Sequence, residues 1–128
     1  MYYDINLKEV VEKVRKILEK EDKVLIAVIF GSATRRNRVR DIDVAVYLKP
    51  KYTLKELLLL EAKIEKILKV PVDLVPLDQA SLKLAYKALA KGIKVVVKDP
   101  LLYSSLLTYA LGQIQDMRIK LNSIKVLE

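Results

Sequence analysis

The chain has 128 residues, of which 52% are hydrophobic and 31% charged, so we expect one domain with a single hydrophobic core. Lysine and arginine outnumber the acidic residues by 24 to 16, and the resulting net charge of +8 favours anionic partners. The sequence contains neither cysteine nor histidine, which excludes disulfides, thiolate or imidazole metal sites, and nucleophiles activated by histidine.

The first ten residues, MYYDINLKEV, lack a basic region followed by an apolar stretch, so no secretory signal is expected. No run approaches the roughly 18 apolar residues that a membrane span requires. We therefore expect a cytoplasmic protein with no membrane contact. The many lysine, glutamate, isoleucine and valine residues are also typical of a thermophilic source.

The first half of the chain reads as a helix, two strands and a second helix. Residues 6–21 place apolar side chains at helical spacing behind Asn6, which is a suitable N-cap. The β-branched segments 23–30 and 41–48 predict two strands, the second ended by Pro50. Thr53, with Glu56 three residues later, predicts a helix over residues 54–68.

The second half alternates strands and helices. We expect a strand at 70–77, a helix at about 79–90 ending near Gly92, and a strand at 93–98. Asp99 followed by Pro100 predicts the start of a last helix over about 100–122. This order favours an α/β (α+β) fold in which a mixed sheet of about four strands is flanked by helices. The short link 31–40 allows the first two strands to be antiparallel neighbours.

Two aspartates, Asp41 and Asp43, open the second strand. Residues i and i+2 of a strand point to the same face, so both carboxylates would lie side by side while Ile42 faces the core. Two such charges raise each other's pKa unless a cation lies between them, and oxygen ligands of this kind suit Mg²⁺. The alternative is a solvated Asp-x-Asp on an edge strand that binds nothing.

Gly31 and Ser32 follow the first strand, and Asp73 lies inside the third. A glycine turn can bring backbone N–H groups close to phosphate oxygens, although a plain turn or helix cap is the alternative. An aspartate within VPVDLVPL indicates a residue that faces either a ligand or solvent. If the second and third strands are neighbours, Asp73 would form a triad with Asp41 and Asp43.

Together, a phosphate-binding turn, paired carboxylates and a third carboxylate favour phosphoryl transfer. In such sites, metal ions roughly 3.5–4 Å apart can bridge the attacking and leaving oxygens of an in-line displacement. The protein mainly positions the reacting groups and neutralises charge.

The Gly31–Ser32 pair, the Asp-x-Asp triplet and the later VDLV strand resemble the minimal nucleotidyltransferase (MNT) family of the polymerase-β-like nucleotidyltransferase superfamily. The resemblance extends over nearly the whole chain. It implies a polymerase-β-like nucleotidyltransferase fold and a single minimal nucleotidyltransferase domain over residues 1–128.

The resemblance also implies roles and partners. Gly31 and Ser32 would hold a nucleoside triphosphate, with ATP as the donor. Asp41 and Asp43 would bind Mg²⁺, in a site for two ions. Asp73 would bind one metal and help to deprotonate the acceptor hydroxyl. Family members of this size often act as antitoxins of a HEPN-domain ribonuclease toxin, and some of them transfer AMP from ATP onto a tyrosine of that toxin and silence it.

The segment RRNRVR, residues 35–40, departs from the family pattern. The spacer between Ser32 and Asp41 is slightly shorter than in the usual antitoxin pattern and is more basic. Arg35 and Arg36, nearest the Gly-Ser turn, are the expected phosphate ligands because guanidinium groups suit phosphate oxygens. The segment could instead grip an acidic toxin or an RNA backbone, or form a solvated hairpin loop.

The last helix has two interpretations: it packs on its own sheet, or part of its surface docks onto a toxin or a second copy in a homo-oligomer. Tyr103 and Tyr109 could anchor such an interface, or could simply fill the core and the surface like the other tyrosines. The residues expected to share one face are Leu102, Leu106, Tyr109, Ala110, Gln113, Met117 and Leu121.

Three functions remain open from the sequence. The first is a protein adenylyltransferase that acts as an antitoxin. The second is a non-catalytic antitoxin of the same fold that neutralises its partner by contact alone. The third is a nucleotidyltransferase for RNA or a small hydroxylated molecule, for which a short chain leaves little room to bind the acceptor.

Overall fold

The structure is a computed structural model that describes the backbone of residues 1–127 and the side chains of residues 1–116. Its helices are α1 (Leu7–Glu19), α2 (Leu54–Leu68), α3 (Leu82–Lys91) and α4 (Pro100–Leu127). Its strands are β1 (Tyr3–Asp4), β2 (Val24–Phe30), β3 (Arg38–Val39), β4 (Ile42–Leu48), β5 (Val72–Pro76) and β6 (Ile93–Val97). A 3-10 turn, η1 (Gly31–Thr34), follows β2 directly.

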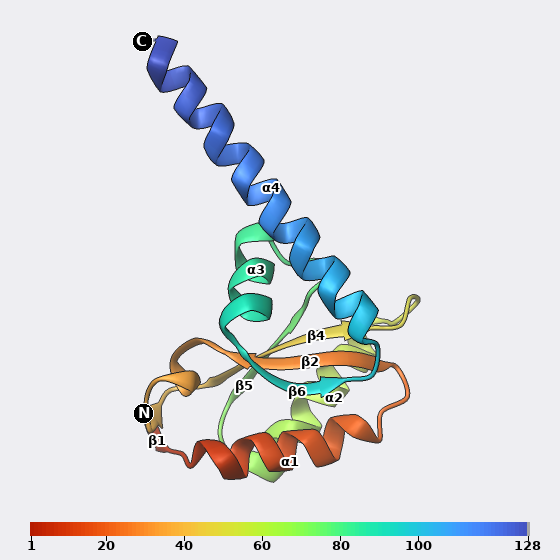
Figure 1. The fold of residues 1–128 in the computed structure, drawn as a ribbon. Helices are drawn as coiled ribbons and strands as arrows, with labels where there is room; N and C mark the ends of the chain where they lie inside the picture. The colour runs from red at the N-terminus through yellow and green to blue at the C-terminus, as the bar shows by residue number, and fades with distance from the viewer. Residues whose placement is uncertain (128) are drawn as a thin grey trace.

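The four long strands form one mixed sheet in the order β5-β4-β2-β6. Strand β2 is antiparallel to both of its neighbours, whereas β4 and β5 are parallel. Helices α1 and α2 cover one face of this sheet, and α3 and the first part of α4 cover the other (Figure 1). The predicted mixed α/β architecture is therefore confirmed, including the antiparallel pairing of the first two predicted strands.

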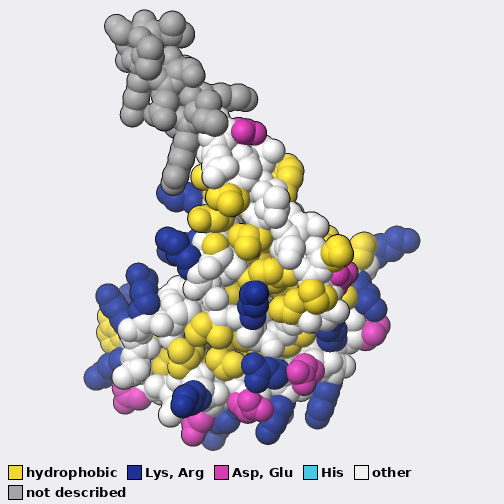
Figure 2. Space-filling model, viewed as in Figure 1, with side chains coloured by type: hydrophobic (Ala, Val, Ile, Leu, Met, Phe, Trp, Pro, Cys, Tyr) yellow, Lys and Arg dark blue, Asp and Glu magenta, His cyan; other side chains and the backbone are white. Residues whose placement is uncertain are grey.

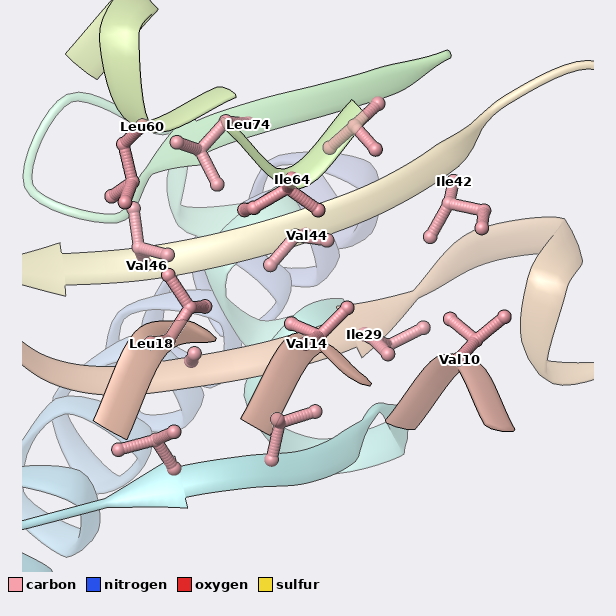
Figure 3. Packing of buried hydrophobic residues seen from close by; sticks show 14 of the residues in the cluster. Val10, Val14, Leu18, Ile29, Ile42, Val44, Val46, Leu60, Ile64 and Leu74 are labelled. Carbon is pink, nitrogen blue, oxygen red and sulfur yellow. The ribbon is translucent and has the colours of Figure 1, made fainter. Parts of the chain in front are cut away.

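The alternation of β4 separates the two faces of the sheet. Ile42, Val44 and Val46 point into the cluster beneath α1 and α2, where each is fully buried (Figure 3). Ala45 points to the other face and joins the cluster beneath α3 and α4. Asp43 has the same parity as Ala45, so its side chain lies on the α3/α4 face.

Three helix starts agree with the predicted caps. The side chains of Asn6, Thr53 and Asp99 accept hydrogen bonds from backbone N–H groups three residues later, at 3.2, 3.1 and 3.0 Å. The predicted start of α3 at residue 79 is wrong by three residues. The Ser81 hydroxyl caps the helix by accepting from Leu84 N–H at 3.2 Å, and the preceding residues form a turn.

A small two-stranded sheet was not predicted. β1 and β3 pair antiparallel, with Tyr3 opposite Val39 and Asp4 opposite Arg38. The Ile5 N–H extends this pairing by donating to the Asn37 carbonyl at 2.7 Å. The N-terminal residues are thereby tied to the arginine-rich segment that precedes β4.

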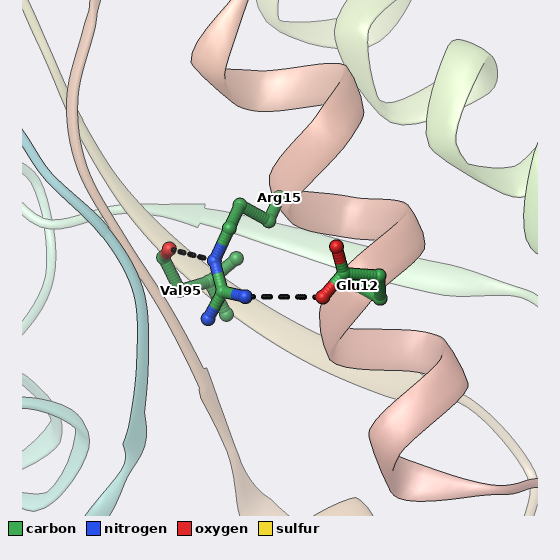
Figure 4. A network of polar contacts seen from close by, with 3 residues as sticks. All are labelled: Glu12, Arg15 and Val95. Carbon is green, nitrogen blue, oxygen red and sulfur yellow. Dashed lines mark hydrogen bonds and ion pairs between the residues drawn. The ribbon is translucent and has the colours of Figure 1, made fainter.

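A single arginine links α1 to the edge strand β6. The Arg15 Nε donates to the Val95 carbonyl at 3.1 Å, and its Nη1 lies 3.2 Å from the Glu12 carboxylate (Figure 4). The contact satisfies a backbone carbonyl at the edge of the sheet and fixes the position of α1 on it.

Helix α4 continues beyond the predicted end at residue 122, to Leu127, and projects away from the sheet (Figure 1). Tyr103 is buried, and its hydroxyl donates to the Leu89 carbonyl, so its predicted role as an interface anchor is wrong. Tyr109 is 61% exposed, as an anchor requires. The side chains of Met117 and Leu121 lie outside the described residues. Within residues 1–127, no helix has the length and apolar character needed to cross a membrane.

Candidate functional site

The parallel pairing of β4 and β5 brings two of the predicted aspartates together. Asp43 and Asp73 are direct partners in the register, one position after the pair Ile42 and Val72. Those two apolar residues are buried on the α1/α2 side. The two aspartates therefore share the opposite face, near the ends of the strands that lie closest to the Gly31 turn.

Asp41 completes the acidic cluster, which we define as Asp41, Asp43 and Asp73. It is exposed and lies just before β4, two residues from Asp43. Burial raises the pKa of Asp43 from 3.8 to about 6, with further contributions from the charges of Asp41 and Asp73. The Lys87 ammonium opposes this rise. Asp43 is thus a carboxylate whose negative charge lacks sufficient compensation from the protein.

Gly31 packs directly against this carboxylate. Its φ angle is +79°, in the left-handed region that favours glycine, and a Cβ at this position would lie 2.4 Å from Asp43 Oδ2. A side chain at residue 31 would displace Asp43 or the turn itself. The structure therefore explains why glycine is needed here, and it places the predicted phosphate-binding turn next to the predicted metal ligand.

The turn after Gly31 is compact. The Ser32 carbonyl accepts from the N–H groups of Arg35 and Arg36 at 3.0 and 2.9 Å, and the Thr34 hydroxyl donates to the Gly31 carbonyl at 2.7 Å. Within the described residues, the Ser32 hydroxyl has no hydrogen-bond partner of its own in the protein, which leaves it available to a ligand.

The arginine-rich segment is divided into two parts. Arg35 and Arg36 are exposed at the end of η1, next to the turn. Arg38 and Arg40 instead lie over the ring of Tyr2, with guanidinium carbons 5.8 and 5.1 Å from its centroid. The segment is thus an exposed link between β2 and β4 whose second half is held by β3 and Tyr2.

The chemistry of the acidic cluster suits a hard divalent cation, because carboxylate oxygens are the preferred ligands of Mg²⁺. Among the described side chains, no three acidic groups already converge closely enough to hold a metal ion. Asp41 and Asp73 are exposed, and the charges of both act on Asp43. A cation there would offset the repulsion that raises the pKa of Asp43.

Sequence reasoning missed two residues near this site, Tyr2 and Lys87. The spacing of Lys83, Lys87 and Lys91 predicts one basic stripe on α3, since residues four apart share a helix face. The sequence offers no local signal that Lys87 acts on Asp43, because that interaction depends on how α3 packs on the sheet.

Comparison with solved structures shows the same fold. The chain matches one in the crystal structure of the toxin–antitoxin MntA–HepT at 21% identity and a TM-score of 0.70, covering 94% of this chain and 99% of that one. A second match is in a tri-AMPylated Shewanella oneidensis HEPN toxin in complex with MNT antitoxin, at 21% identity and a TM-score of 0.73, with coverage of 96% and 100%.

A third match is in a toxin–antitoxin structure with AMP-PNP, at 21% identity and a TM-score of 0.71, covering 97% of this chain and 100% of that chain. No curated protein matches the sequence. The family model described as "Polymerase beta, Nucleotidyltransferase" matches residues 12–101, a span that contains the Gly31 turn and the whole acidic cluster. The chain belongs to the polymerase beta nucleotidyltransferase family.

Proposed function

We propose that this protein is a Mg²⁺-dependent nucleotidyltransferase that acts as an antitoxin, transferring AMP from ATP onto a tyrosine of a HEPN ribonuclease toxin. One observation carries the catalytic part of the proposal. Asp43 and Asp73 lie opposite each other in the register of β4 and β5, and the Asp43 carboxylate packs against Gly31. Two carboxylates therefore lie beside a glycine turn in a member of the polymerase beta nucleotidyltransferase family.

The residues of the Gly31 turn and of the acidic cluster have distinct proposed roles. Gly31 and Ser32 receive the triphosphate, with Arg35 and Arg36 close enough in sequence to contact its outer oxygens. Asp41, Asp43 and Asp73 would hold Mg²⁺, which when bound neutralises charge on the triphosphate and polarises the α-phosphoryl group.

The bond changes of the transfer balance without a further reactant. The acceptor hydroxyl oxygen forms a bond to the α-phosphorus of ATP, and the bond from that phosphorus to the bridging oxygen breaks, releasing pyrophosphate. Asp73 accepts or directs the hydroxyl proton, because it lies on the same face as Asp43 but is more exposed. The protein mainly aligns the two oxygens and neutralises charge.

The proposed partner is supported by the structural neighbours, which include toxin–antitoxin complexes and one AMPylated HEPN toxin. Helix α4 offers a candidate docking surface, since Leu101 and Tyr109 are 71% and 61% exposed on it. Figure 2 shows apolar side chains gathered over the described part of α4 and where it meets the body. A toxin and its antitoxin of this type would act in the cytoplasm.

Two alternatives have support of their own. A binding antitoxin without catalysis would need only the exposed surface of α4. A transferase for RNA is favoured by the net charge of +8 and by the exposed Arg35 and Arg36.

One assay separates the three functions. ATP labelled on its α-phosphate is incubated with Mg²⁺, the protein and, in parallel, a HEPN toxin, transfer RNA or small hydroxylated acceptors. We expect label on a toxin tyrosine and none after Asp41→Asn with Asp43→Asn. Label on RNA or a small acceptor would support the third function. If the double variant transfers no label but still protects cells from the toxin, the result would support the non-catalytic binding antitoxin.

A further inference from the structure

The small β1–β3 sheet presents two arginines and a tyrosine together on its outer side. Arg38 and Arg40 are exposed on either side of Val39, which is buried, so both side chains point away from the core. Tyr2 is 50% exposed, and the two guanidinium carbons lie 5.8 and 5.1 Å from the centroid of its ring. We call Tyr2, Arg38 and Arg40 the Tyr2 platform.

The protein leaves the positive charges of the Tyr2 platform without partners. Among the described side chains, Arg38 and Arg40 form no ion pair, whereas four other basic side chains do. Asp4 lies opposite Arg38 in the register and Asp41 follows Arg40, yet neither carboxylate pairs with them. The contacts with the Tyr2 ring position the guanidinium groups without using their N–H donors, so these donors are pre-positioned for an anionic ligand.

The surroundings of the Tyr2 platform favour a polyanion over a protein partner. Protein–protein interfaces have an apolar centre from which charged residues are depleted. Among the described residues, the large apolar side chains that are exposed lie on α2 and α4, apart from Met1 and Tyr2 at the N-terminus. Surfaces that bind nucleic acid are instead polar and strongly positive, and the chain carries a net charge of +8.

The side chains of the Tyr2 platform suit a single strand of nucleic acid. Guanidinium groups match the geometry of phosphate oxygens, and aromatic rings beside a basic surface contact the flat faces of unpaired bases. The platform also adjoins the candidate site, since β3 contacts the η1 turn and η1 contacts β4. Arg40 is bonded directly to Asp41, with Cα atoms about 3.8 Å apart.

We propose that the Tyr2 platform binds single-stranded nucleic acid, with Arg38 and Arg40 donating to backbone phosphates and the exposed part of Tyr2 contacting a base. This binding goes beyond the proposed transfer of AMP and does not require it, because none of the three residues has a role in that reaction. RNA and DNA present the same phosphates, so the test compares both.

The test measures binding of short fluorescent single strands of RNA and DNA to the full chain by fluorescence anisotropy over a range of salt concentrations. Arg38→Gln with Arg40→Gln should weaken binding by at least about tenfold. The slope of log affinity against log salt should become shallower by about 1.4, because each phosphate contact on a single strand contributes about 0.7. Arg38→Lys with Arg40→Lys should keep most of the slope, since the charge remains.

Lys55→Gln with Lys66→Gln is the matched control for the change in charge. Both lysines are exposed on α2, and neither forms an ion pair among the described side chains. The control should bind the strands within about twofold of the wild type. Equal affinity for RNA and DNA would indicate phosphate and stacking contacts alone, and a preference for RNA would add a contact to the 2′-hydroxyl; both support the proposal.

Four results would overturn the proposal. These are no binding of either strand by the wild type, undiminished affinity in the Arg38 and Arg40 glutamine variant, an equal loss in the control, and competition by a polyglutamate peptide as strong as that by unlabelled RNA. The last result would assign the platform to acidic protein segments.

Titration calorimetry with a non-hydrolysable ATP analogue and Mg²⁺ separates the platform from the transfer site. The Arg38 and Arg40 glutamine variant should bind the analogue within about twofold of the wild type. A loss as large as that for the strands would place both arginines in the triphosphate site and overturn the proposal. If the wild type binds the strands but transfers no AMP to a toxin, the platform stands and the proposed function fails.

Discussion

At the residue scale, the site depends on how closely Gly31 approaches Asp43. Gly31→Ala would add a Cβ 2.4 Å from Asp43 Oδ2 at a φ of +79°. We expect it to lower the free energy of unfolding by about 1–2 kcal/mol, the cost of a left-handed non-glycine residue, and to impair nucleotide binding. Urea unfolding measures the first effect and calorimetry the second.

Gly112→Ala is the matched control for that substitution. A Cβ at Gly112 would meet no atom within 4 Å, and the residue lies inside α4. We expect alanine there to stabilise the protein by roughly 0.5–1 kcal/mol, because glycine is a poor helix former. Similar destabilisation by both substitutions would contradict the proposed packing of Gly31 against Asp43.

The charge of Asp43 predicts an unusual pH dependence. Its pKa in the folded protein is about 6, against an ordinary value of 3.8, so the folded state holds the proton more tightly than the unfolded chain does. The free energy of unfolding therefore falls as the pH rises through this window, and the penalty is complete above it. Asp43→Asn removes the penalty, so the variant should exceed the wild type in stability by roughly 1 kcal/mol near neutral pH.

Denaturant unfolding across the pH range tests this expectation. The difference between Asp43→Asn and the wild type should disappear below the ordinary pKa of 3.8, where the carboxyl group is protonated in both states. A variant that is less stable than the wild type at neutral pH would show that Asp43 is adequately compensated by the protein.

Mg²⁺ should offset the loss of stability that the ionised Asp43 carboxylate causes. If the acidic cluster binds the cation, Mg²⁺ at a hundredfold its Kd should stabilise the wild type by about 2.7 kcal/mol, and EDTA should remove the gain. Thermal unfolding with and without Mg²⁺ measures the effect. Asp43→Asn should lose most of it, whereas Asp22→Asn, which changes an exposed carboxylate paired with Lys49, should keep it. An equal gain in both variants would place the cation elsewhere.

At the scale of elements, the small β1–β3 sheet controls the arginine-rich segment. Tyr2 lies under Arg38 and Arg40, and β1 pairs with β3 in register. Tyr2→Ala should therefore increase hydrogen exchange of the amides in residues 37–40, whereas Tyr2→Phe, which keeps the ring, should not. Unchanged exchange in both variants would show that backbone pairing alone holds the segment.

The same elements show what the sequence can and cannot predict. Asn6, Thr53 and Asp99 give local capping signals, and the long strands have a clear apolar pattern, so these elements follow from neighbouring residues. β1 and β3 have only two residues each, too few to show an alternating apolar pattern, and they pair across more than thirty positions of the chain. The start of α3 was missed because Ser81 competes with earlier turn residues as the N-cap.

The candidate site divides in the same way. Asp41, Asp43 and Asp73 could be named from the sequence because charged residues stand out in apolar strands. Their proximity could be anticipated only under the assumption that β4 and β5 are neighbours, which the structure confirms. The contact between Gly31 and Asp43 and the action of Lys87 on Asp43 depend on tertiary packing, so no local pattern reports them.

At the scale of the whole molecule, the proposed sites of nucleotide transfer and of partner binding lie on different parts of the fold. The acidic cluster lies at one end of the sheet, whereas α4 projects from the body with Tyr109 exposed (Figure 1). Tyr109→Ser should weaken binding of a HEPN toxin by about tenfold while leaving the affinity for the ATP analogue unchanged. Thr108→Ala, an exposed neighbour, is the control.

Calorimetry with the purified toxin and with the analogue measures both affinities. A loss of nucleotide affinity in Tyr109→Ser would show that α4 contributes to the transfer site. Unchanged toxin binding would place the partner on another surface.

In the proposed function, the acidic cluster catalyses the transfer of AMP. The most direct test is the initial rate at which label passes from α-labelled ATP to a HEPN toxin, measured for the wild type, Asp43→Asn and the control Asp22→Asn. We expect the wild type and Asp22→Asn to transfer label at similar rates, and Asp43→Asn to be slower by at least about a hundredfold, as for the loss of a metal-binding carboxylate. Undiminished transfer by folded Asp43→Asn would show that the acidic cluster is not the transfer site.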